Sequence, residues 1–224
     1  MVRAKICGLM RREDALAADA AGADYLGVVL TAGFGRSVRP ADARALFEGT
    51  QAPKVAVLVN ETVEAAVAAA RALGADVIQL HGNEQPVVVE ALRARGTWMV
   101  WKAVRARTLE DVEHAVARYA HLVDGFLIEG RNDAALGTGG ARVRLDPAKA
   151  RALLPAHVTF VLAGGLTADT VTDAALAFQP DVVDVSSGVE RALGEKDHAK
   201  VRAFIEGARL AGAVSAGSTG GASK

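Results

Sequence analysis

The sequence predicts an α/β protein in which eight parallel strands close into a single (β/α)8 TIM barrel. Short β-branched, apolar runs alternate with stretches rich in Ala, Leu, Arg and Glu, and no break in composition divides the chain. Most of the apolar runs are nearly continuous, as expected for parallel strands that are buried on both faces. The 224 residues suit one such barrel. An open, doubly wound sheet is the alternative that this alternation leaves open.

The predicted strands are residues 4–8, 25–30, 55–59, 77–81, 98–104, 126–129, 158–163 and 182–186. The clearest helices between them are residues 64–73 and 109–120, which have helical apolar spacing. Thr62, Thr108 and Thr167 are predicted to cap the third, fifth and seventh helices, since a hydroxyl oxygen can accept from a first-turn N–H.

Two segments do not fit the strand–helix repeat. Residues 130–145 are rich in glycine and arginine, and a long loop after a barrel strand is expected to cover the active site. Residues 211–224 are mostly Gly, Ala, Ser and Thr and are predicted to form a flexible tail. The sequence therefore predicts one barrel domain over residues 1–210, followed by that tail.

The bulk composition disfavours several classes of function. Acidic and basic residues number 26 each, so the formal net charge of zero predicts neither a nucleic-acid nor a membrane partner. The single cysteine, Cys7, cannot form an intrachain disulfide, and the five histidines are too scattered to predict a metal site. No run resembles a signal peptide, a membrane span, a Walker loop or a dinucleotide fingerprint. These features predict a soluble, cytoplasmic protein.

The predicted seventh and eighth strands both end in small residues that suit an anion-binding turn. Gly164 and Gly165 follow the seventh strand, and Ser186, Ser187 and Gly188 end the eighth. Small residues let backbone N–H groups approach an anion closely. Two such turns after the last two strands of a barrel predict a phosphate site.

Other strand ends carry candidate functional side chains, because function in a barrel lies at the carboxyl ends of its strands. Cys7 is either a small buried residue or, as a thiolate, a general base or nucleophile. Glu129 either forms a salt bridge at its strand end or faces the pocket as a general acid. Arg36 is either a surface residue or reaches over the barrel mouth to a carboxylate. His81 and Lys102 are weaker candidates.

Over residues 3–207 the chain resembles the phosphoribosylanthranilate isomerases of the ribulose-phosphate-binding barrel group. The motifs that carry the resemblance are KICG at residues 5–8, VAVLVN at 55–60, QLHG at 79–82, AGGL at 163–166 and DVSSGVE at 184–190. The pairing of the first motif with the last is quite specific, whereas either alone would be weak.

The resemblance implies an Amadori rearrangement of N-(5-phosphoribosyl)anthranilate that needs no cofactor or metal. Cys7 then corresponds to the general base, and Arg36 to the arginine that holds the anthranilate carboxylate. Asp184 corresponds to an acidic residue of strand eight that supports the site. The phosphate cradle corresponds to Gly164, Gly165, Ser186, Ser187 and Gly188. Relatives are monomers or homodimers, and either state is expected here.

The chain departs from the family pattern near the expected sugar and aryl ends of the substrate. Glu129 stands where the family has its aspartate general acid, and Phe34-Gly35-Arg36 replaces Ser-Pro-Arg. Residues 141–144 also differ from the family's loop. These departures leave two alternatives open: a family paralogue that acts on another phosphorylated sugar, and a protein that only binds one.

Overall fold

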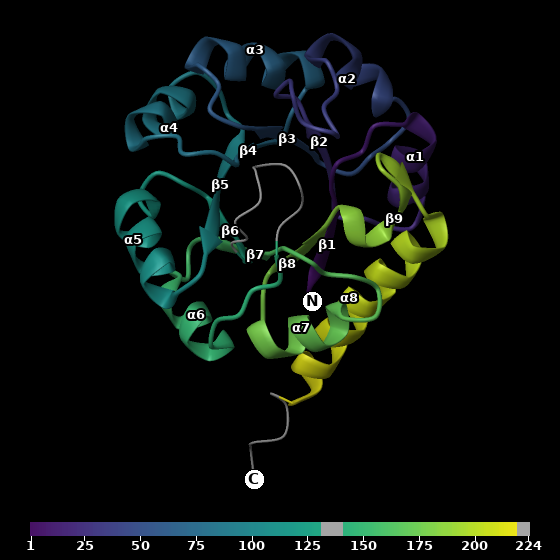
Figure 1. Ribbon diagram of the computed structural model, residues 1–224, viewed down its shortest axis with the longest axis vertical. Coiled ribbons are helices and arrows are strands. Elements are labelled where there is room, and N and C mark those ends of the chain that lie inside the picture. The colour runs from purple at the N-terminus through teal and green to yellow at the C-terminus, as the bar shows by residue number, and fades with distance from the viewer. Residues whose placement is uncertain (131–140, 219–224) are drawn as a thin grey trace.

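The computed structural model describes residues 1–130 and 141–218 and shows eight parallel strands closed into a barrel in sequence order (Figure 1). The predicted fold class is confirmed. The strands are β1 (Arg3–Ile6), β2 (Tyr25–Val29), β3 (Lys54–Leu58), β4 (Val77–Leu80), β5 (Met99–Ala106), β6 (Gly125–Gly130), β7 (Thr159–Leu162) and β8 (Val182–Val185). β1 pairs with β8 from Arg3 opposite Val182 to Ile6 opposite Val185, which closes the barrel.

Helices surround this barrel as an outer ring (Figure 1). They are α1 (Arg12–Ala20), α2 (Pro40–Leu46), α3 (Val63–Leu73), α4 (Pro86–Arg93), α5 (Leu109–Tyr119), α6 (Pro147–Leu153), α7 (Val171–Phe178) and α8 (His198–Ser218). After β8 the chain also forms a short 3-10 helix, η1 (Ser187–Val189), and a small antiparallel pair, β9 (Glu190–Ala192) and β10 (Glu195–Lys196).

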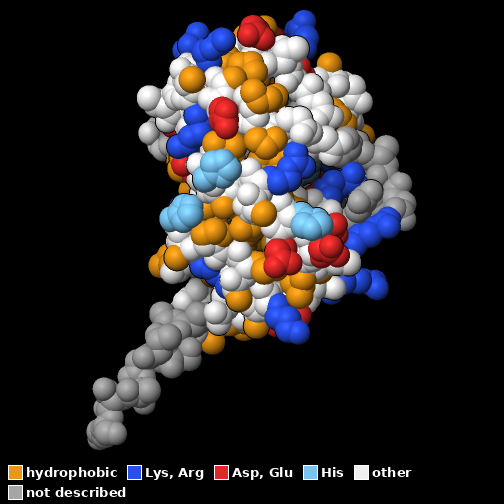
Figure 2. Space-filling view, turned by 90° about the vertical axis from the view of Figure 1, so that its left-hand side faces the viewer, with side chains coloured by type: hydrophobic (Ala, Val, Ile, Leu, Met, Phe, Trp, Pro, Cys, Tyr) orange, Lys and Arg blue, Asp and Glu red, His pale blue; other side chains and the backbone are white. Residues whose placement is uncertain are grey.

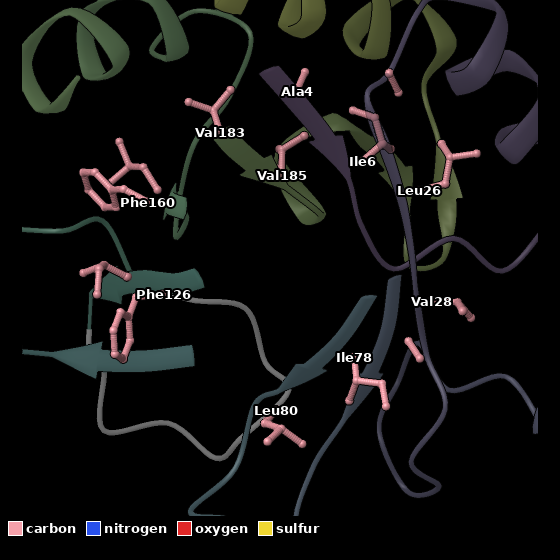
Figure 3. Close-up of a cluster of buried hydrophobic side chains, with 14 of the residues drawn as sticks. Ala4, Ile6, Leu26, Val28, Ile78, Leu80, Phe126, Phe160, Val183 and Val185 are labelled. Atoms are coloured by element: carbon pink, nitrogen blue, oxygen red, sulfur yellow. The ribbon is translucent and has the colours of Figure 1, made fainter. Parts of the chain in front are cut away.

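Alternation along the strands divides the apolar side chains between two cores. One set packs between the strands and the helices and includes Ala4 and Ile6 of β1 and Val183 and Val185 of β8 (Figure 3). Apolar side chains at the alternate strand positions form the second core, inside the barrel. There Trp101 packs edge-on against Tyr25, with 5.0 Å between the ring centroids. Because successive side chains point to opposite faces of a strand, residue parity decides which side chains can reach the barrel mouth.

Two of the three predicted helix caps are confirmed. Thr62 accepts a hydrogen bond from the N–H of Ala65, and Thr108 forms a capping box with Asp111. The cap predicted at Thr167 is wrong, because α7 begins three residues later, after Thr170. The carbonyl of Thr167 instead accepts from the N–H groups of Thr170 and Val171, in a turn that precedes the helix.

The last helix extends past the predicted domain boundary. α8 runs to Ser218, so the boundary expected after residue 210 falls within it, and Ala211 is fully buried. Alanine favours helix at least as strongly as any other residue, so the Ala-rich composition of this stretch suits helix as well as a tail. The predicted long loop is described at its ends, where Gly130 and Ala141 exchange backbone hydrogen bonds. Residues 131–140 of that loop lie outside the described residues.

Acidic and basic side chains are interspersed on the face shown in Figure 2. Among the described helices, none is long and apolar enough to cross a membrane. Within residues 1–130 and 141–218, no group of three or more His, Cys, Asp or Glu side chains could hold a metal ion.

Candidate active site

One pocket lies at the carboxyl ends of the strands and collects nearly all of the predicted site residues. Its lining includes Cys7 after β1, Arg36 after β2, His81 after β4, Glu129 on β6 and Asp184 on β8. The predicted phosphate residues Gly164, Gly165, Ser186, Ser187 and Gly188 line the same pocket. Residues from both halves of the chain therefore face one cavity, as the barrel topology requires.

The turn after β7 brings backbone donors close to the pocket. Gly164 has φ +89° and Gly165 has φ +61°, a region that favours glycine. A Cβ atom on Gly164 would lie 2.1 Å from the carbonyl oxygen of Ala141, so no larger residue fits there. Neither N–H group has a hydrogen-bond partner among the described residues. Amides at a pocket wall that have no partner in the described part of the chain suit an anion.

The turn after β8 lies beside the first one in the pocket wall. Ser187 and Gly188 open η1, and the first N–H groups of a helix have no acceptor within it. The carbonyl of Ser186 accepts a hydrogen bond from the ammonium of Lys196 at 3.0 Å. This bond ties the turn to β10.

Cys7 lines the pocket, is buried, and is the only cysteine of the sequence. The ammonium of Lys5, two residues earlier on the same face of β1, lies 2.9 Å from Oδ1 of Asp184, and both this ammonium and the thiol of Cys7 lie beside Gly27. Burial raises the pKa of the Cys7 thiol; the ammonium of Lys5 opposes that rise, and the carboxylate of Asp184 adds to it. The structure thus places the candidate base beside a fixed ion pair.

Glu129 faces the pocket from β6 and is only 6% exposed. Its Oε1 lies 3.3 Å from Nε2 of His81 and 3.6 Å from Nε of Arg105. The Nε2 of Gln79 lies 2.8 Å from Nδ1 of His81. Because an amide nitrogen only donates, Nδ1 accepts, and the ring hydrogen lies on Nε2, where it faces Glu129.

Gln79 also presents a polar atom without a partner. Its Oε1 is buried and has no hydrogen-bond partner among the described residues, and Gln79 lines the pocket. A buried acceptor without a partner is costly, so this oxygen suits a hydroxyl or N–H group of a ligand.

Arg36 reaches into the pocket wall but is held by a carboxylate of the protein itself. Its Nε and Nη2 donate to the two oxygens of Glu190 at 2.8 and 2.7 Å, a paired geometry typical of arginine and carboxylate. Nη1 has no hydrogen-bond partner among the described residues. Lys196 adds a third contact to Glu190 at 3.1 Å. Although burial alone would raise it, these cations hold the pKa of Glu190 below its ordinary value.

Of the two weaker candidates, His81 faces the pocket and Lys102 does not. Lys102 lies on the helix side of β5, where its ammonium contacts Glu84 at 3.0 Å and the carbonyl of Gly82 at 2.7 Å. Burial lowers the pKa of Lys102, and Glu84 opposes that change. Lys102 therefore anchors the turn after β4.

Sequence reasoning missed five residues in or around the pocket: Lys5, Gln79, Arg105, Glu190 and Lys196. The alternation of side chains along a strand could have found the first three. Lys5 and Gln79 each lie two residues before a predicted site residue, and Arg105 lies four residues after an interior residue of its strand, Trp101. Glu190 and Lys196 lie beyond the last strand, and no local pattern marks them.

The fold and this pocket define the class of the protein: a (β/α)8 barrel with a pocket at the carboxyl ends of its strands. The chain belongs to the N-(5'phosphoribosyl)anthranilate (PRA) isomerase family, whose family model matches residues 4–207. It is 39% identical over 209 residues to the N-(5'-phosphoribosyl)anthranilate isomerase of Pelobacter propionicus, covering 92% of this chain and 94% of that protein. It is 38% identical over 216 residues to the enzyme of that name from Pseudomonas putida, covering 94% and 98%. The resemblance predicted from the motifs is confirmed.

Solved structures of the same family have the same architecture. The phosphoribosyl anthranilate isomerase of Thermotoga maritima is 33% identical, with a TM-score of 0.83, and the match covers 94% of this chain and all of that one. Another phosphoribosyl anthranilate isomerase, in complex with reduced 1-(o-carboxyphenylamino)-1-deoxyribulose 5-phosphate, is 32% identical with a TM-score of 0.80. That match covers 94% of this chain and 100% of that one.

Proposed function

We propose that this protein is an aldose–ketose isomerase of tryptophan biosynthesis that converts N-(5-phosphoribosyl)anthranilate into 1-(2-carboxyphenylamino)-1-deoxyribulose 5-phosphate. The observation that carries the proposal is a single pocket, in a chain of this family, that holds a thiol, a carboxyl group and two glycine turns. This set supplies one group for each demand of the reaction: an acid, a base and a seat for phosphate.

Glu129 is proposed as the general acid and Cys7 as the general base. The protonated carboxyl group of Glu129 gives its proton to the furanose ring oxygen, and the ring opens to an iminium ion. The Cys7 thiolate then takes the proton from C2, and the resulting enolamine tautomerises to the ketone. The nitrogen of the substrate is the electron sink, so the proposed reaction needs no cofactor or metal.

The remaining pocket residues are proposed to fix the substrate at its two ends. The phosphate lies against the N–H groups of Gly164, Gly165, Ser187 and Gly188, with the hydroxyl of Ser186 beside them. The anthranilate carboxylate lies against Arg36, whose Nη1 is left available by its pairing with Glu190. Asp184 lines the pocket and is proposed to support the site through its ion pair with Lys5.

An assay with the anthranilate substrate tests the proposal. Wild-type protein is expected to abolish the fluorescence of the substrate, and Cys7→Ala is expected to lose at least about a hundredfold in kcat/KM, the contribution of a general base. Complementation of a tryptophan-requiring strain that lacks the isomerase supplies a second readout. Binding of a sugar phosphate without turnover of the anthranilate compound would instead support a paralogue or a binding protein.

Because the proposed reaction belongs to tryptophan biosynthesis, we propose the cytoplasm as its location. For the oligomeric state, a monomer or a homodimer remains the prediction, and sedimentation of the purified protein distinguishes the two.

A further inference from the structure

Lys5 is a buried charge that the reaction proposed above does not yet use. Its side chain is wholly buried in the barrel interior, and its ammonium lies 2.9 Å from Oδ1 of Asp184 and on the same side of β1 as the thiol of Cys7. Although burial alone would lower it, Asp184 and Cys7 hold the pKa of Lys5 above its ordinary value. The lysine therefore stays a cation, and it cannot itself take a proton from a substrate.

The neighbouring strand leaves room for this contact. A Cβ atom on Gly27 of β2 would lie 2.9 Å from Sγ of Cys7 and 3.2 Å from Nζ of Lys5. Any larger residue at position 27 would press on both groups at once. The glycine thus allows the ammonium and the sulfur to occupy one shared space beside β2.

Four charged side chains, from four separate parts of the chain, interact electrostatically with Cys7. They are Lys5 of β1, Arg36 after β2, Asp184 of β8 and Lys196 of β10. Glu190 pairs with both Arg36 and Lys196. Three cations thus stand against two carboxylates, and a thiolate at Cys7 would balance the cluster. This excess of one positive charge opposes the rise in the pKa of the Cys7 thiol that burial causes.

We infer that Lys5 is a positioning residue of the reaction: fixed by Asp184, its ammonium holds the sulfur of Cys7 and stabilises it as the thiolate that takes the C2 proton. The inference rests on the proposed function for its purpose, but the contact itself can be tested without any turnover. Asp184 has two opposed effects on the thiol, since it orients the lysine and also repels the thiolate.

The test follows the alkylation of the folded protein by iodoacetamide as a function of pH. Cys7 is the only cysteine of the chain, so a mass change of one adduct reports on this thiol alone. Lys5→Met keeps the length of the side chain and removes its charge. The alkylation curve is expected to move to higher pH by about 1 unit or more, the effect of losing an opposite charge in contact.

Asp184→Asn is expected to shift the curve in the opposite direction and so separates electrostatics from loss of structure. The asparagine keeps an oxygen that can still accept from the ammonium of Lys5 but loses the charge that repels the thiolate, so the curve is expected to move to lower pH. General loosening of the pocket would move both variants the same way. Lys102→Met is the matched control, because Lys102 is also a buried, paired lysine but lies outside the barrel interior. Its curve is expected to coincide with that of the wild type.

A Lys5→Met curve that coincides with the wild type would overturn the inference. If Lys5→Met fails to fold, Lys5→Gln, which also removes the charge, takes its place with the same expected shift and the same refuting result. The same shifts should appear in the limb of kcat/KM that rises with pH. Expected thiol shifts in a protein without isomerase activity would refute the proposed function and leave the Lys5–Cys7 contact intact.

Discussion

Replacing Glu129 by glutamine removes the proton that the proposed mechanism gives to the ring oxygen and changes little else. The amide has the same shape as the carboxyl group, and its Oε1 can still accept the hydrogen of His81 Nε2 across 3.3 Å. Positioned general acids contribute about 10²–10⁴-fold to rate, or about 2.7–5.4 kcal/mol of barrier. We therefore expect Glu129→Gln to lose that factor in kcat, with a smaller change in KM because the phosphate turns are untouched.

The measurement is steady-state loss of substrate fluorescence for Glu129→Gln, with Glu110→Gln as a control on the exposed side of α5. Glu129→Asp adds a geometric test. It withdraws the carboxyl group by about 1.5 Å, one carbon–carbon bond, which breaks the 3.3 Å contact with His81. A displacement of that size costs about a hundredfold. A kcat of Glu129→Gln within a few-fold of the wild type, or a gain in Glu129→Asp, would refute the reasoning.

Three further predictions concern the pocket walls. Arg36→Met should raise KM about tenfold or more while kcat changes less, since a charge-assisted contact worth about 1.5–3 kcal/mol is lost; equal loss in kcat would contradict a binding role. Gly164→Ala should abolish inhibition by inorganic phosphate, because its Cβ would meet the Ala141 carbonyl at 2.1 Å. The pKa of Glu190 is held low in the folded state, so its stabilising contribution is present above the unfolded pKa, about 4.3, and is lost as pH falls through the folded value. Urea unfolding between pH 3 and 6 should therefore be more pH-dependent for the wild type than for Glu190→Gln.

The fold could be predicted from the sequence because each strand of a parallel barrel is a buried apolar run. The run around residues 126–129 consists of apolar residues closed by one carboxyl group, and the structure contains it as β6 with Glu129 facing the pocket. The ends of the helices were harder to predict than the strands. Thr167 has the chemistry of a cap, but two more residues of turn separate it from the N-cap position at Thr170. Local residue type cannot distinguish a cap from the start of a turn that precedes the helix.

The pair Lys102 and Arg105 shows why the site was predicted less completely than the fold. Both are cations of β5; Lys102 is the fourth of its eight residues and Arg105 the seventh. They differ by an odd number of positions, so one side chain points towards the helices and the other into the pocket. Sequence reasoning chose Lys102 by its place in the strand, and the structure places it against Glu84. Counting parity from Trp101, the large interior residue of the same strand, would have favoured Arg105.

Glu190 shows what parity cannot reach. It lies 154 positions from Arg36 along the chain, yet it holds that arginine with two hydrogen bonds and also contacts Lys196. Lys196 in turn donates to the carbonyl of Ser186, in the turn proposed to hold phosphate. One carboxylate thus fixes the residue proposed for the aryl carboxylate and, through a lysine, the turn proposed for the phosphate. Glu190 lies on β9 and Lys196 on β10, so the small β9–β10 pair supports both ends of the proposed substrate site.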